Sequence, residues 1–245
     1  MKRVTVMAWD TATAWTSAAI VRVGEDGSFD ILVEFELEGG PSHSQILPPQ
    51  IEALLKSAGL SPVELDLLAV GRGPGSFTGL RTGLSLAKGL AMGAGRPLMG
   101  ISTLETLAAS MIFEEGAALA APVIDARHLE IFTALYRASK AGGLDLECLL
   151  PPQPVSPAGF SGLMESAAPG GAVSVAGPAL GLVREFLAGH PDLSAGPAVL
   201  PPSAVMLARL AAARLKLNGQ GLSANPPLPM YIRQPDIRQS GIVLK

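Results

Sequence analysis

The sequence lacks the residues that several common kinds of functional site require. Its 245 residues include one cysteine, Cys148, so an internal disulfide bond and a cysteine-built metal site are excluded. The three histidines, His43, His128 and His190, stand apart, and no two are spaced to place their nitrogens on one helix face. A Gly-x-Ser-x-Gly elbow is also missing. We therefore expect neither zinc catalysis nor a serine or cysteine nucleophile.

Aromatic residues and net positive charge are equally scarce. The chain has two tryptophans, two tyrosines and seven phenylalanines, and its formal charge is −3, so it offers no broad stacking or basic surface for nucleic acid. Any contact with RNA should be local or supplied by a partner. The longest apolar run, 117–124, is far too short for a membrane span. We expect a cytoplasmic protein without a membrane anchor.

The chain opens with three predicted strands, 4–9, 16–23 and 29–36, joined by short turns. Asp10, Thr11 and Thr13 lie where the first strand ends. A carboxylate and hydroxyls in such a place can contact a metal-bound phosphate. The same residue types also commonly bond to the backbone of their own turn, and the sequence does not decide between the two roles.

A glycine-rich turn follows an apolar strand at 65–70 and precedes a predicted helix at 78–92 and a strand at 97–101. Ser76 or Thr78 can cap this helix. Free amides at a helix start can hold a phosphate, although the Walker A lysine and the dinucleotide-binding spacing are both absent. The alternative is that the glycines serve only the geometry of the turn. The candidate residues of this glycine turn are Gly71, Arg72, Gly73, Gly75, Ser76 and Thr78.

Small residues recur every four positions in this helix, at Gly79, Gly83, Ala87 and Ala91, and so share one face. Glycine inside a soluble helix costs roughly 1 kcal/mol relative to alanine, so a close contact is the expected reason for it. The contacting element can belong to this chain or to a partner. We predict a partner interface on this face.

A second strand ending in an aspartate, Asp125, is followed by a strand at 129–136 and resembles the start of the chain. The repeat predicts a duplicated lobe. We expect an N-terminal lobe at 1–102 and a C-terminal lobe at 103–245, with a Pro- and Gly-rich connection at 151–171. A helix at 203–217, capped by Ser203, is the clearest in the chain.

Four segments together resemble the TsaB (YeaZ) family. They are Asp10-Thr11-Ala12-Thr13, His43-Ser44, Asp125-Ala126-Arg127 and the run from Gly71 to Arg81, which is the strongest match. The resemblance spans roughly residues 1–136, and Met230-Tyr231-Ile232-Arg233 looks like the usual C-terminal strand of the family.

The resemblance implies an α/β actin-like ATPase fold with two ribonuclease-H-like lobes. It also implies a non-catalytic subunit of the bacterial system that installs N6-threonylcarbamoyladenosine (t6A) in tRNA. Such a subunit binds and activates TsaD, works with TsaE, reaches tRNA through the complex, and forms a homodimer when alone. The resemblance implies no metal and no cofactor of the chain's own, and it allows ATP or ADP with Mg at the complex interface.

The competing interpretation is an enzyme of the same fold. In a nucleotide-dependent ATPase or kinase, Asp10 and Asp125 would hold magnesium phosphate between the lobes.

Overall fold

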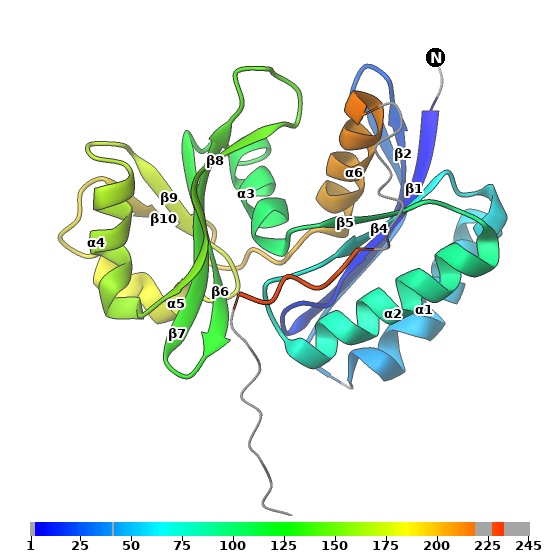
Figure 1. Ribbon diagram of the computed structural model, residues 1–245, viewed down its shortest axis with the longest axis horizontal. Helices are drawn as coiled ribbons and strands as arrows, with labels where there is room; N and C mark the ends of the chain where they lie inside the picture. The colour runs from blue at the N-terminus through cyan, green and yellow to red at the C-terminus, as the bar shows by residue number, and fades with distance from the viewer. Residues whose placement is uncertain (1–2, 41, 219–226, 233–245) are drawn as a thin grey trace, which may run out of the picture.

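Two five-stranded sheets form the framework of the computed structural model, which describes residues 3–40, 42–218 and 227–232 (Figure 1). The first sheet has the order β3-β2-β1-β4-β5, in which β1, β2 and β3 are antiparallel and β4 and β5 run parallel to β1. Its strands are β1 (Arg3–Asp10), β2 (Trp15–Gly24), β3 (Phe29–Glu38), β4 (Leu67–Gly71) and β5 (Leu98–Ile101).

The second sheet repeats this arrangement in the order β10-β9-β6-β7-β8. Its strands are β6 (Leu119–Arg127), β7 (Glu130–Ala138), β8 (Leu146–Val155), β9 (Val173–Ala176) and β10 (Leu193–Ala195). Taken in chain order, β6 to β10 occupy the places of β1 to β5, with the same parallel and antiparallel pairings. Both sheets are therefore ribonuclease-H-like, and the predicted two-lobe α/β fold is confirmed.

Helices cover both faces of each sheet (Figure 1). On the first sheet, α1 (His43–Ala58) and α2 (Phe77–Ala94) pack on one face, and the 3-10 turn η1 (Pro62–Glu64) links α1 to β4. On the second, α3 (Thr103–Phe113) packs on one face. The other face is covered by α4 (Pro157–Ala167), α5 (Leu180–Val183) and the 3-10 turn η2 (Arg184–Leu187).

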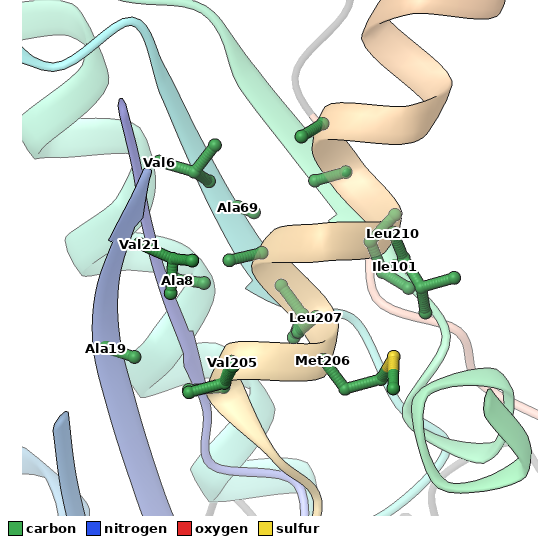
Figure 2. Close-up of a cluster of buried hydrophobic side chains, with 14 of the residues drawn as sticks. Val6, Ala8, Ala19, Val21, Ala69, Ile101, Val205, Met206, Leu207 and Leu210 are labelled. Atoms are coloured by element: carbon green, nitrogen blue, oxygen red, sulfur yellow. The ribbon is translucent and has the colours of Figure 1, made fainter. Parts of the chain in front are cut away.

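The last described helix, α6 (Ala204–Asn218), returns to the first sheet. Figure 2 shows α6 lying on the strands that carry Ala8 and Ala69, with Leu210 beside Ile101. The short side chains of Ala8 and Ala69 let the helix approach the strands closely. Residues 103–245 therefore do not all pack in the second lobe as predicted. The periodicity of α6 identifies an apolar face, but it does not identify the sheet that this face will cover.

Other predicted elements also differ from the structure. Residues 151–155 complete β8 instead of forming a connection, and the rest of the predicted connection is largely helical, because α4 spans Pro157–Ala167. Residues 227–232 form no strand, although Met230 N–H donates one backbone hydrogen bond to Arg72 O at 2.7 Å. Arg233 lies outside the described residues. Within the described ranges, no helix is long and apolar enough to cross a membrane.

Candidate functional site

Asp10 ends β1 and is almost completely enclosed, with 1% of its surface exposed. Its Oδ1 accepts a hydrogen bond from Ala12 N–H at 2.7 Å, and its Oδ2 accepts one from Thr103 Oγ1 at 2.7 Å. Gly71 has no side chain because a Cβ there would lie 1.8 Å from Oδ2. Burial raises the pKa of Asp10 to about 6, and the two hydrogen bonds limit the rise. The carboxyl group thus joins the β1–β2 turn, the end of β4 and the start of α3.

The two threonines beside Asp10 are also buried and bonded within the chain. Thr11 Oγ1 donates to Gly79 O of α2 at 2.8 Å. Thr13 Oγ1 accepts the Trp15 N–H at 3.1 Å, which is the local turn bond that the sequence left open. Neither hydroxyl points to solvent, so their geometry corresponds to a structural role.

His43, at the first position of α1, closes the same turn from outside. Its Nδ1 lies 2.7 Å from Thr16 Oγ1, and its Nε2 lies 3.0 Å from Thr13 O. A carbonyl oxygen can only accept, so Nε2 carries the proton and Nδ1 accepts from the hydroxyl. Half-burial lowers the pKa of His43, which favours this neutral form.

The glycine turn is held against the β1–β2 turn. A Cβ at Gly75 would lie 2.0 Å from Ala12 O, and Ser76 N–H donates to that same oxygen at 2.6 Å. Ser76 Oγ caps α2 by accepting the Gly79 N–H at 3.2 Å, whereas Thr78 is exposed. Two amides at the start of α2 are therefore already bonded to the chain. This geometry favours a conformational role for the glycines over a phosphate cradle.

The predicted partner face of α2 is buried inside the lobe. A Cβ at Gly79 would lie 2.0 Å from Thr11 O, and one at Gly83 would lie 2.5 Å from Thr11 Oγ1. Ala87 is 0% exposed and Ala91 is 7% exposed. The small residues let α2 approach the end of β1, and this contact is within the chain. The assignment of Gly79, Gly83, Ala87 and Ala91 to a partner interface is therefore wrong for the folded monomer.

The opposite face of α2 carries Ser85, Gly89, Met92 and Gly93, which we call the outer face. Met92 is 84% exposed, and a Cβ at Gly89 or Gly93 would meet no atom within 4 Å. Beside this face lies an open apolar groove of about 460 Å³ between α1 and α2. Its apolar lining comes from Pro48, Ile51, Leu55, Leu60, Leu86 and Leu90.

Asp125, near the end of β6, occupies the place in the second lobe that Asp10 has in the first, but it is exposed. Its Oδ1 accepts the Arg127 N–H at 2.7 Å, and the Arg127 guanidinium lies 3.6 Å from its Oδ2. The hairpin of β6 and β7 therefore supplies both of these contacts. Among the described residues, no group of three or more histidine, cysteine or acidic side chains is arranged to hold a metal.

The two arginines of the glycine-rich region differ in their surroundings. Arg81 lies 3.6 Å over the Phe77 ring, and its Nε donates to Tyr231 Oη at 3.4 Å. The Tyr231 and Phe77 rings are 5.4 Å apart. Arg72 is half-buried. Burial raises the pKa of Glu105, and the charge of Arg214 and, to a smaller extent, that of Arg72 oppose the rise.

Sequence reasoning missed Thr103, the donor that fixes Asp10, and the outer face of α2. The sequence contains a feature that could have indicated each of them. Ser102 and Thr103 are hydroxyl residues directly after β5, at the sheet edge where β1 and β4 also end. Ser85, Gly89 and Gly93 form a second stripe with a spacing of four residues.

Comparison with known proteins connects this arrangement to tRNA modification proteins. The family model for TsaD, tRNA N6-adenosine threonylcarbamoyltransferase, matches residues 38–172, which is more than half of the chain. The Escherichia coli tRNA threonylcarbamoyladenosine biosynthesis protein TsaB is 38% identical over 60% of this chain and 63% of its own length. The Bacillus subtilis TsaB is 35% identical over 54% of this chain and 55% of its own. These alignments thus span about half to two thirds of the curated relatives.

The similarity to a solved structure covers nearly all of both chains. A Pseudomonas aeruginosa protein, described as uncharacterized with similarity to peptidase YeaZ, superposes with a TM-score of 0.75. It is 30% identical, and the superposition covers 94% of this chain and 100% of that one. The structure of YeaZ from Pseudomonas aeruginosa gives a TM-score of 0.71 at 27% identity, over 93% of this chain and 99% of that one.

Proposed function

Because the chain belongs to the TsaB (YeaZ) family, we propose that it is the non-catalytic scaffold subunit of a bacterial t6A complex. In this role it binds and activates TsaD, works with TsaE, and reaches tRNA through the assembled complex. The relatives named TsaB, and the match to the threonylcarbamoyltransferase model, support a part in t6A biosynthesis.

The burial of Asp10 is the main support for a non-catalytic role. An aspartate that holds magnesium phosphate needs a carboxylate oxygen directed at the ion. Here Oδ1 is bonded to Ala12 N–H, and Oδ2 is bonded to Thr103 Oγ1 and packed against Gly71. These contacts favour a scaffold over the alternative ATPase or kinase.

The outer face of α2 is the surface that we assign to TsaD. Exposed Gly89 and Gly93 let a second helix approach to the near end of the usual interaxial range of roughly 8–10 Å. Met92 can adapt its shape to a partner, and the adjoining apolar groove adds surface to bury. We infer that two copies of the chain pair through this same face when TsaD is missing. Any ATP or ADP with Mg would then bind at the interface of the complex.

Reconstitution tests the proposal. The isolated chain, incubated with magnesium-ATP, should release no phosphate. Added to TsaD and TsaE from the same source, with tRNA, ATP and an activated threonylcarbamoyl donor, it should restore t6A formation, while TsaD and TsaE without it should remain inactive. Phosphate release by the isolated chain that Asp10→Asn abolishes would support the enzyme interpretation instead.

A further inference from the structure

The last described segment, Pro227–Ile232, crosses from the first lobe to the second and is drawn in red in Figure 1. It follows α6 in the sequence, and α6 packs on the first sheet. The segment has no regular secondary structure, so its position depends on individual contacts with each lobe.

On the first lobe, the segment lies against β5 and the glycine turn. Met230 N–H donates to Arg72 O at 2.7 Å, and Met230 O lies 3.3 Å from where a Cβ of Gly73 would be. Pro227 packs directly on the backbone of β5, because a Cβ at Gly100 would lie 2.6 Å from Pro227 Cβ. Gly100 and Gly73 therefore leave the space that the segment occupies.

Two further contacts continue along the segment. Tyr231 packs on Phe77 with ring centroids 5.4 Å apart and accepts a hydrogen bond from Arg81 Nε, so it is bound to the start of α2. Ile232 packs on the core cluster of the second lobe, which includes Leu104 of α3 and Ile124 of β6. Consecutive residues thus contact different lobes.

We propose that Pro227–Ile232 is an intramolecular latch that holds the two lobes at a fixed relative angle. A six-residue segment with contacts at both ends resists separation of the two surfaces that it joins. Pro227 and Pro229 restrict the backbone of the free segment, which lowers the entropy lost when it docks. The latch requires no bound ligand, and it does not depend on the identity of the proposed partner.

The lobes are also joined directly, through α3 and α6. Arg209 of α6 forms an ion pair with Glu114, next to the end of α3, at 3.1 Å, and Arg214 of α6 forms one with Glu105 of α3. Helix α6 packs on the first sheet and α3 on the second. The latch therefore adds a second connection, through different elements, to the one that α3 and α6 make.

The test uses the full chain with spin labels on Ser57→Cys in α1 and Ala158→Cys in α4, in a Cys148→Ser background. Gly100→Ala places a methyl group against Pro227 and should displace the latch. The distance distribution between the labels should broaden, and protection of the Met230 amide from hydrogen exchange should fall by roughly tenfold, as expected for one lost backbone hydrogen bond. The control Leu228→Ala changes a side chain that is 67% exposed and should leave both measurements as in the parent.

A rescue variant separates displacement of the latch from damage to β5. Pro227→Gly removes the ring atoms that the new methyl group would meet, so Gly100→Ala with Pro227→Gly should recover both measurements. Loss of Met230 protection with an unchanged distance distribution would overturn the proposal, because the lobes would then not need the latch. Unchanged Met230 protection in Gly100→Ala, or failure of the rescue, would also contradict it.

Discussion

The two lobes share one strand order but use the end of their first strand in different ways. In the first lobe, Asp10 is buried, and in the second its counterpart Asp125 is exposed on a hairpin. The neighbouring strand explains part of the difference. Gly71, at the end of β4, leaves room for the Asp10 carboxylate, whereas Gly177, after β9, packs against Val123 O of β6. A repeated topology thus places equivalent residues without giving them equivalent roles.

The two lobes also differ in how the helices α2 and α4 pack. In the first lobe, α2 presses small residues against β1 and leaves Gly89 open on the outside. In the second lobe, the exposed Gly162 of α4 is also open, but α4 buries Phe160 and Met164 as its main contacts. The stripe of small residues on α2 therefore has no equivalent on α4.

The largest expected effect, on the free energy of unfolding, comes from disrupting the packing of α2 against β1. Ala87→Arg places an unpaired charge in the core beneath α2, and we expect a loss of about 3–5 kcal/mol of unfolding free energy, or no stable fold. Urea unfolding followed by circular dichroism measures the change. A stable Ala87→Arg protein would show that this face of α2 is exposed after all. Gly162→Arg, on the exposed face of α4, should stay within about 0.5 kcal/mol of the parent.

The second-largest effect is expected in the pH dependence of stability, which should differ between variants of Asp10 and Asp125. The pKa of Asp10 is raised to about 6 in the folded protein, above its unfolded value, so the folded state holds the proton more tightly. Its contribution to stability is therefore fully present below about pH 4 and is lost as the pH rises through about 6. The loss is on the order of 3 kcal/mol for a shift of this size. Asp10→Asn should remove this part of the pH dependence, and Asp125→Asn should leave it in place; the reverse pattern would contradict our description of Asp10.

Deleting each carboxyl group at pH 5 should have a smaller effect. Asp10→Ala leaves the Ala12 N–H and the Thr103 hydroxyl without their acceptor, and we expect a cost of roughly 1–2 kcal/mol. Asp125→Ala removes an exposed group and should change stability by less than about 0.5 kcal/mol. Thermal unfolding of both variants provides the comparison. Equal effects would mean that burial does not separate the two positions.

The smallest effect is expected for Arg72 and Arg81, on the affinity for tRNA. Replacing Arg72 and Arg81 with glutamine removes two positive charges from a region with no acidic residue between Leu67 and Leu104. We expect tRNA binding by the assembled complex to weaken by roughly two- to fivefold at low ionic strength, and less at high salt. Filter binding at two salt concentrations measures this change. Unchanged affinity at low salt would mean that the charge of Arg72 and Arg81 serves only contacts within the chain.

The sequence predicted most elements because their signals are local. Ser76 caps α2 as expected, and the repeated strand-aspartate-strand pattern correctly indicated two related lobes. The β1–β2–β3 meander and the helix predicted at 78–92 also match the structure to within a few residues.

The face of α2 could not be assigned from the sequence because its contacts are distant along the chain. A stripe of small residues indicates a close approach, but it does not identify the approaching group, which here is Thr11. The same limit explains α6, whose partner sheet precedes it by more than a hundred residues. The role of Asp10 also depended on Thr103, a donor contributed by a different element.

Affinity for TsaD can be compared between one substitution in each lobe. Gly89→Arg on the outer face of α2 and Gly162→Arg on α4 both place an arginine at an exposed helical glycine with open space around it. Affinity for TsaD is measured by isothermal titration calorimetry with each variant. We expect Gly89→Arg to abolish binding while its melting temperature stays near the parent value, and Gly162→Arg to bind as the parent does. Full binding by a folded Gly89→Arg protein would contradict the assignment of the outer face of α2 to TsaD.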